Sequence, residues 1–359
     1  MTKLRLIILS VLVAIFCSPN SKAQNGVGGT PPSFKYSNER LRFVQQPFTT
    51  PINFKIEDLK KEDAITNKTG MPLRFAQAIH ADLDIDKNGK WSTLDDGQKI
   101  WQLPISSPGA NGLIVSFSEM YIPEGAQLFI YTADKSQIVG AYTHNENRNG
   151  GVFDSPVLFQ DEVILEYVAS TISTEEPRIK LSDIGYVYNL KNTNSQDISC
   201  MVNINCPEGD NWQLQKNGVL QMSMRFSDGW YYCSASLVNN ARNDATPYIL
   251  TADHCIADGS DTITFETVKF QFFRERSGCT TVNYTTPTIQ ETMIGAELLV
   301  DLSIYGKSDG VLLKLRDSIP TDWNVYYNGW DASNIAATSG VSIHHPDGAV
   351  KTISTFTES

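Results

Sequence analysis

The chain has 359 residues, of which 41% are hydrophobic and 19% charged, so it is long enough for two domains and has the composition of a globular protein. Its 40 acidic residues exceed its 29 basic ones, and a formal net charge of −11 argues against nucleic acid as a partner. After the N-terminus, no stretch contains the roughly 18 apolar residues that a membrane span requires. We therefore expect an acidic, multi-domain protein that neither binds nucleic acid nor spans a membrane.

Residues 1–23 have the features of a secretory signal peptide. Two basic residues precede an apolar run at 6–16, and small residues at 21 and 23 indicate a cleavage before Gln24. A lipid anchor at Cys17 is the less favoured alternative, because Phe16 stands where lipoprotein signals have a small residue. We therefore expect a secreted protein, extracellular or periplasmic, in which disulfides persist.

Residues 24–191 contain short runs of β-branched and aromatic residues separated by turn-forming sequences. Turns are indicated by Pro123-Glu124-Gly125 and Asn149-Gly150-Gly151. The expected strands are Lys99–Pro104, Leu113–Phe117, Gln127–Tyr131, Gln137–Thr143 and Glu162–Val168. Short strands at this regular spacing predict an antiparallel β-sandwich of jelly-roll type.

One segment of this region has the spacing of a calcium-binding loop. Asp84 to Asp95 matches the pattern of an EF-hand, whose carboxylates surround a glycine turn. Such a loop requires a helix on each side, whereas Ala81–Ile85 and Lys90–Thr93 alternate like strands. Because Asn88-Gly89 is a favoured pair for a tight turn, we expect a β-hairpin, with calcium binding as the alternative.

A polar segment follows the predicted sandwich. Residues Asn189–Ser199 include no aromatic side chain, and Lys191 within them is expected to be exposed and open to proteolysis. We place the domain boundary here, so that residues 192–359 form a second domain.

The second domain contains five of the six cysteines of the chain: Cys200, Cys206, Cys233, Cys255 and Cys279. In an exported protein an odd number leaves one thiol without a partner. No two of them have zinc-finger spacing, and the adjacent His344 and His345 face opposite sides of an expected strand. We therefore expect no metal site.

Six further strands are expected around these cysteines, enough to close a small antiparallel barrel: Val219–Phe226, Trp230–Asn239, Tyr248–Ala252, Thr262–Phe273, Ala296–Tyr305 and Val311–Leu315. The third strand ends in a turn that contains His254 and Cys255. A disulfide from Cys255 to Cys233, in a strand expected to lie beside it, would hold the imidazole in place. Rigid placement is what a general base requires.

Several short sequences resemble, in order, those of the lysyl endopeptidase branch of the trypsin-like serine proteases. They are Cys206-Pro207-Glu208-Gly209-Asp210, Cys233–Asn240, Tyr248–Cys255, Gly329-Trp330-Asp331 and Ile343–Pro346. The resemblance covers about residues 198–356. It implies an all-β protein in which the sandwich is a propeptide domain, followed by the first barrel and the beginning of the second barrel of a chymotrypsin-like fold.

The resemblance also implies roles for individual residues. His254 would be the general base, and Asp309, which precedes the strand Val311–Leu315, would be the acid that orients it. Asp301 is the alternative acid, because an apolar alternating stretch follows it as well. The family distance to Gly329-Trp330-Asp331 favours Asp309.

The catalytic serine of the family is missing from the sequence. None of the serines after Asp309 lies in a Gly-x-Ser-Gly turn, and they are Ser318, Ser333, Ser339, Ser342, Ser354 and Ser359. The resemblance pairs Cys233 with Cys255 and Cys206 with Cys279, which leaves Cys200 without a partner. We interpret both absences as one truncation before the nucleophile, in the second barrel.

Two functions are compatible with these features. The first is a secreted serine endopeptidase precursor that cleaves after lysine or another basic residue, with no cofactor or metal. Its partners would be protein or peptide substrates and its own propeptide, residues 24–191, and the present chain would be inactive. The second is a catalytically inactive secreted protein that binds peptide or glycan through the β-sandwich.

Overall fold

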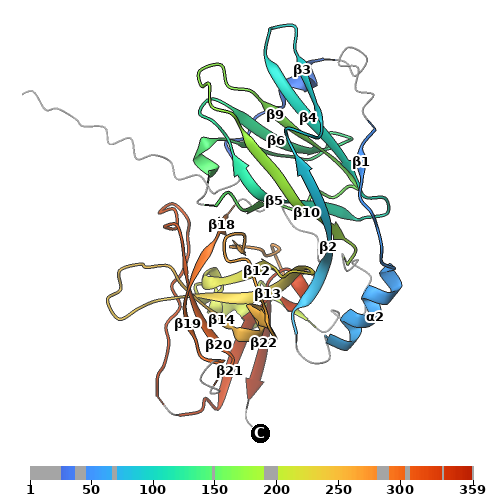
Figure 1. The fold of residues 1–359 in the computed structure, drawn as a ribbon. Helices are drawn as coiled ribbons and strands as arrows, with labels where there is room; N and C mark the ends of the chain where they lie inside the picture. The colour runs from blue at the N-terminus through green and yellow to red at the C-terminus, as the bar shows by residue number, and fades with distance from the viewer. Residues whose placement is uncertain are drawn as a thin grey trace, which may run out of the picture.

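The computed structural model describes residues 26–36, 46–66, 71–147, 150–189, 201–280, 291–303, 308–333 and 335–357. The expected signal peptide, Cys17, Lys191 and Cys200 lie outside these residues. The described chain is mostly β-strand, with helix α2 (Ile56–Thr66) beside the sheets (Figure 1). Within the described residues, no helix has the length and apolar character needed to cross a membrane. The expectation of an all-β protein is therefore confirmed.

The N-terminal region contains a mixed sheet in which one pairing, between β1 and β4, is parallel. Its strands, in spatial order, are β1 (Phe48–Thr49), β4 (Lys99–Ser106), β9 (Glu162–Val168), β6 (Gln127–Thr132) and β7 (Ile138–Tyr142), with β3 (Lys90–Thr93) also paired to β4. Strand β4 is buried along six consecutive residues, and both sides of it are covered by apolar side chains. The expected strands of this sheet are all present, and β9 has the expected bounds.

A second sheet faces the first. Its N-terminal part consists of β2 (Leu73–Asp84), β10 (Arg178–Val187), β5 (Gly112–Tyr121) and β8 (Phe153–Asp154). One core contains side chains from both sheets, including Leu83, Val115 and Leu181 from the second sheet and Leu103, Ile130 and Leu165 from the first. Residues 71–187 thus form two β-sheets packed around a shared apolar layer.

The turn after Asp84 corrects the hairpin prediction. Strand β2 pairs with β10, whereas β3 pairs with β4, so the turn joins strands of two different sheets. Hydrogen bonds within Asp84–Asn88 and from the Trp101 indole to the Asn88 carbonyl, at 2.8 Å, fold the turn against β4. Gly89 has φ +76°, and a Cβ there would lie 2.6 Å from the Trp101 ring. The tight turn is present, but the pairing expected across it is wrong.

The second region contains a ring of paired strands. Its members are β12 (Val219–Arg225), β13 (Gly229–Val238), β14 (Tyr248–Ala252), β17 (Lys269–Gln271), β18 (Thr292–Ile294), β19 (Ala296–Asp301) and β20 (Gly310–Leu315). Antiparallel pairs run from β17 through β12, β13, β14 and β20 to β19, and β18 pairs back to β17. Because only Gly295 separates β18 from β19, the path returns to its start around one buried core.

Two expected strands of this region are shorter in the structure. The run at 262–273 is divided into β16 (Asp261–Thr262) and β17 by a turn in which Thr267 donates twice to the Thr264 carbonyl. Strand β16 pairs instead with β15 (Ala257–Asp258). Strand β19 ends at Asp301, whose carboxylate accepts hydrogen bonds from Ser303. In both cases local side-chain and backbone bonds end the ladder.

The last described residues form a small sheet beside the barrel. Strand β21 (Ser339–His344) pairs with β22 (Thr352–Thr357), which also pairs with β11 (Val202–Asn203). The segment 325–330 makes one isolated parallel bridge, between Val238 and Asn328. Its backbone bonds from Asn328 hold it to β13 without extending a ladder.

The two regions share one continuous sheet. The start of β13 pairs antiparallel with β2, from Gly229 opposite Gln77 to Tyr232 opposite Leu73. Figure 1 shows β2 running from the N-terminal sheets down to the barrel. The expected boundary near residue 191 falls outside the described residues and stays a prediction.

Candidate active site

His254 lies directly after β14, in the short turn η7 (Asp253–Cys255). Strand β14 alternates between the buried Ile249 and the exposed Leu250, as a strand on a barrel wall does. The neighbouring strand β20 runs antiparallel to β14, with Ala252 opposite Gly310. This register places the residues just after β14 beside Asp309, which comes just before β20.

Asp309 holds both the ring and the backbone of His254. Its Oδ2 lies 2.6 Å from His254 Nδ1, and its Oδ1 accepts a hydrogen bond of 3.0 Å from the His254 backbone N–H. The Asp309 carbonyl accepts another from the Asp253 N–H, at 3.1 Å. With Nδ1 directed at the carboxylate, Nε2 is the nitrogen left to exchange a proton with a substrate or a nucleophile.

The electrostatics of the pair favour an ionised carboxylate. Partial burial raises the pKa of Asp309, but the hydrogen bonds from the His254 backbone and ring outweigh it and hold the pKa below its ordinary value. The side chains of His254 and Asp309 are 37% and 57% exposed, so the site is open to solvent. The arrangement can therefore orient an imidazole through an ionised carboxylate.

A disulfide lies against the imidazole. Cys233 in β13 is bonded to Cys255, and one His254 ring nitrogen lies within 4.8 Å of both sulfur atoms. Since these sulfurs are joined to each other, they do not offer the thiolates that a metal site would use. The bridge closes a loop of 22 residues, which contributes about 3 kcal/mol by loop closure and fixes the turn to β13.

The alternative acid, Asp301, is engaged elsewhere. Its carboxylate accepts hydrogen bonds of 2.8 and 2.7 Å from the backbone and hydroxyl of Ser303. Among the described residues, the carboxylate that bonds the His254 ring is that of Asp309, and no serine hydroxyl bonds to it.

The two adjacent histidines near the C-terminal sheet have a structural setting. His345 is buried, its backbone N–H donates to Ser234 Oγ at 2.9 Å, and its Nδ1 lies 3.0 Å from the Ala349 carbonyl. Burial holds the pKa of His345 well below its ordinary value and lowers that of His344 as well. Ser234 thus links this turn to the strand of Cys233.

The second disulfide joins Cys206 to Cys279. It closes a loop of 73 residues, and Cys206 precedes the short helical turn η5 (Pro207–Trp212). Both disulfides therefore lie within the second region.

Comparisons with known proteins agree with these features. Residues 194–359 match the family model for the C-terminal domain of lysyl endopeptidase. The chain is also 27% identical, over 304 residues, to a lysyl endopeptidase of Pseudomonas aeruginosa, an alignment that covers 79% of this chain and 64% of the relative. The chain thus spans less than two thirds of that relative's length. From residue 194 onward, the protein is similar to the C-terminal domain of lysyl endopeptidase.

Proposed function

We propose that this chain carries the general base and the orienting acid of a secreted serine endopeptidase that cleaves after lysine or another basic residue. The observation that supports this most directly is the 2.6 Å contact between His254 Nδ1 and Asp309 Oδ2, on a turn tied down by the Cys233–Cys255 disulfide. The similarity to lysyl endopeptidase supports the reaction class and the choice of a basic side chain.

In the proposed mechanism, His254 Nε2 removes the proton of a serine hydroxyl as that oxygen attacks the peptide carbonyl. The ionised Asp309 then stabilises the imidazolium, and His254 returns the proton to the leaving amine. The family resemblance implies a nucleophilic serine in a Gly-x-Ser-Gly turn, and the backbone N–H groups of such a turn would stabilise the oxyanion. In this proposal, residues 24–191 are a removable propeptide, with cleavage near Lys191.

The disulfides support secretion as a part of the same proposal. Two disulfides lie within residues 206–279, and such bonds persist in oxidising compartments. Secretion through the N-terminal leader, into the periplasm or outside the cell, therefore forms part of the proposed function.

The decisive experiment uses the reading frame extended past codon 359. We expect the longer chain to contain a Gly-x-Ser-Gly turn and to hydrolyse a lysyl amide faster than a glutamyl amide. Replacement of His254 by alanine should reduce the rate by about 10⁴-fold or more. Replacement of Glu297, an exposed residue of β19 in the barrel, by alanine is the control and should leave the rate unchanged.

The outcomes separate the two functions. If the folded longer chain cleaves no lysyl substrate, the endopeptidase proposal is refuted, and a catalytically inactive binding protein becomes the better account. If it cleaves and His254→Ala retains the full rate, the assigned base is wrong. The 359-residue chain itself should show no amidase activity.

A further inference from the structure

One edge of strand β13 is shared by two different parts of the chain. Its C-terminal half, Ser236–Val238, pairs with β14, and its N-terminal half, Gly229–Tyr232, pairs with β2. On the opposite edge, β12 pairs along almost the whole strand. Without β2, the backbone groups at Gly229–Tyr232 would be an open strand edge, which is a docking surface for an extended peptide.

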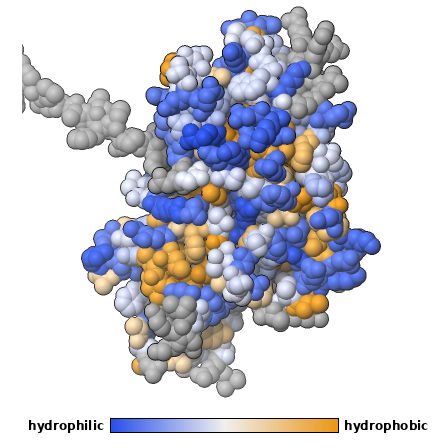
Figure 2. All heavy atoms as spheres, viewed as in Figure 1, coloured by the Kyte–Doolittle hydropathy of each residue, from blue (hydrophilic) through white to orange (hydrophobic). Residues whose placement is uncertain are grey.

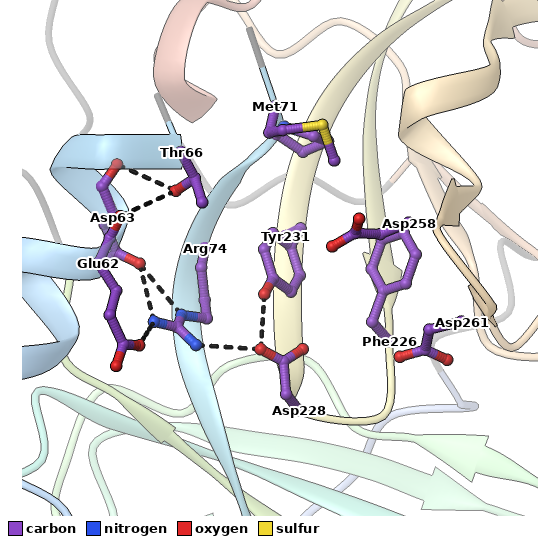
Figure 3. Close-up of a pocket in the computed structure, with 11 residues that line it drawn as sticks. Glu62, Asp63, Thr66, Met71, Arg74, Phe226, Asp228, Tyr231, Asp258 and Asp261 are labelled. Atoms are coloured by element: carbon purple, nitrogen blue, oxygen red, sulfur yellow. Dashed lines mark hydrogen bonds and ion pairs between the residues drawn. The ribbon is translucent and has the colours of Figure 1, made fainter. Parts of the chain in front are cut away.

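Arg74 in β2 forms ion pairs with residues on both sides of this junction. Its Nη1 donates to Asp228 Oδ2 of the barrel at 3.0 Å, and its Nη2 donates to Glu62 Oε2 at 2.9 Å. Its Nε donates to Asp63 Oδ1 at 3.1 Å, so helix α2 holds the guanidinium in place while it reaches Asp228. Arg74 is only 8% exposed. Figure 3 shows its side chain between the helix and the β12–β13 turn.

Beside Arg74, residues of the two regions line a pocket of about 350 Å³. Met71 and Thr66 line it from the N-terminal region, and Phe226, Tyr231 and Asp258 line it from the barrel (Figure 3). Beside this space, the two regions are joined by the strand pairing, by the Arg74–Asp228 ion pair and by a hydrogen bond of 2.8 Å from Gln77 Nε2 to the Asp228 carbonyl.

A second group of contacts has the opposite arrangement of charge. Here the barrel supplies the cation: the Arg225 guanidinium donates to Asp183 and to Ser116 of the N-terminal sheet. The Trp230 indole N–H donates to Asp154 Oδ2 at 2.9 Å, and Lys269 Nζ lies 2.6 Å from the Ser155 carbonyl. The two regions are therefore complementary in charge in both groups of contacts.

Aromatic side chains of the two regions also pack against each other. The rings of Phe75 and Tyr232 stack with centroids 4.0 Å apart and an interplanar angle of 10°. Trp230 is 2% exposed and packs in one cluster with Phe75, Ile114 and Val187. Desolvated aromatic side chains surrounded by paired charges are the features of a stable interface.

We propose that the N-terminal region, residues 26–189, stays bound to the barrel as a separate subunit when the backbone between residues 189 and 201 is cut. Recognition is by addition of β2 to the open edge of β13, with Arg74 as the charged anchor on Asp228. Residues 24–191 contain no cysteine, so no disulfide can hold the two pieces together. This inference rests on the domain boundary near residue 191 that forms part of the proposed function. It does not require catalysis, because the experiment measures the association of the two pieces.

The test uses the full chain with a recognition sequence for a site-specific protease placed between residues 190 and 200. The folded chain is cut, and gel filtration in about 0.15 M NaCl is repeated over a dilution series. We expect the two pieces to co-elute at micromolar concentration. Arg74→Ala should raise the concentration at which half of the pieces separate by at least about 30-fold, because Asp228 then loses its cation and keeps only the hydrogen bond from the Tyr231 hydroxyl.

The control is Lys180→Ala, which removes a lysine that pairs with Glu119 within the N-terminal region. It should leave the half-separation point unchanged. In the uncut chain the connection supplies an effective concentration of about millimolar, so Arg74→Ala should keep the native circular dichroism spectrum. Separation of the unmodified pieces at micromolar concentration would overturn the proposal. Equal half-separation points for Arg74→Ala and Lys180→Ala would overturn the role of Arg74.

Discussion

Lys351 should make the stability of the second region depend on alkaline pH. The side chain is 0% exposed, and its Nζ donates to the Lys216 carbonyl at 2.6 Å. Burial is the main cause that lowers the pKa of Lys351 to about 8, from an ordinary value of 10.5. Glu275 opposes this effect, and Lys216 adds to it. A buried ammonium with this shift costs about 3 kcal/mol of folding free energy at pH 7.

The sign follows from proton linkage. Between pH 8 and 10.5 the unfolded chain keeps the Lys351 proton while the folded chain has released it, so stability rises with pH across this window. Lys351→Met has a similar volume and no charge. It should be more stable than the unmodified chain at pH 7 by about 1–3 kcal/mol, and the difference should shrink toward pH 10.

Urea titrations followed by tryptophan fluorescence at pH 7, 8, 9 and 10 measure this difference. Lys180→Met, at a lysine whose side chain is 49% exposed, is the matched control and should show no such trend. A constant difference between Lys351→Met and the unmodified chain at all four pH values would refute the reasoning.

Three further predictions concern other parts of the chain. Serine replacement of the Cys206–Cys279 pair, which closes 73 residues, should lower the free energy of unfolding by about 4 kcal/mol, against about 3 kcal/mol for the 22-residue Cys233–Cys255 loop. Denaturant unfolding measures both losses, and the reverse order would contradict loop closure as the cause. Burial holds the pKa of His345 well below 6.5, so as the pH falls below 6.5 the unfolded chain gains a proton that the folded chain does not, and stability is lost. The melting temperatures at pH 7 and pH 5 should therefore differ less in His345→Gln than in the unmodified chain, and an equal difference would contradict this. Leu250 and Val300, 47% and 41% exposed, lie on either side of Leu312 in adjacent strands, and Figure 2 shows exposed hydrophobic residues gathered on the barrel. Serine at both positions should reduce the fluorescence of a bound hydrophobic dye, and unchanged fluorescence would show that the dye binds elsewhere.

Strands with a strong local signal could be predicted from the sequence. Glu162–Val168 and Tyr248–Ala252 have the expected bounds because β-branched and aromatic residues fill them and turn residues flank them. Helix α2 was not predicted, since only Leu59 among its apolar residues is buried and no apolar stripe is visible. Its signal is the charge spacing, such as Asp58 and Lys61, which form an ion pair at 2.9 Å.

The pairing of strands that lie far apart along the chain could not be predicted from the sequence. Nothing local in Leu73–Asp84 indicates that its first residues pair with Gly229–Tyr232, because the partner is chosen by burial and charge in the folded chain. The same limit applies at the site. The choice between Asp309 and Asp301 relied on family spacing, whereas its physical basis is the β14–β20 register that places Ala252 opposite Gly310.

The shared edge of β13 also has a consequence for the order in which the polypeptide folds. Residues 73–77 leave the ribosome long before residues 229–232, and N-terminal domains generally fold first during synthesis. We expect the finished N-terminal sheets to offer a template on which the later hairpin aligns, so that the slow search for distant partners is reduced to addition of one strand to an existing edge. In this protein, residues 73–77 of the N-terminal sheets would therefore direct the folding of the barrel, which is synthesised after them.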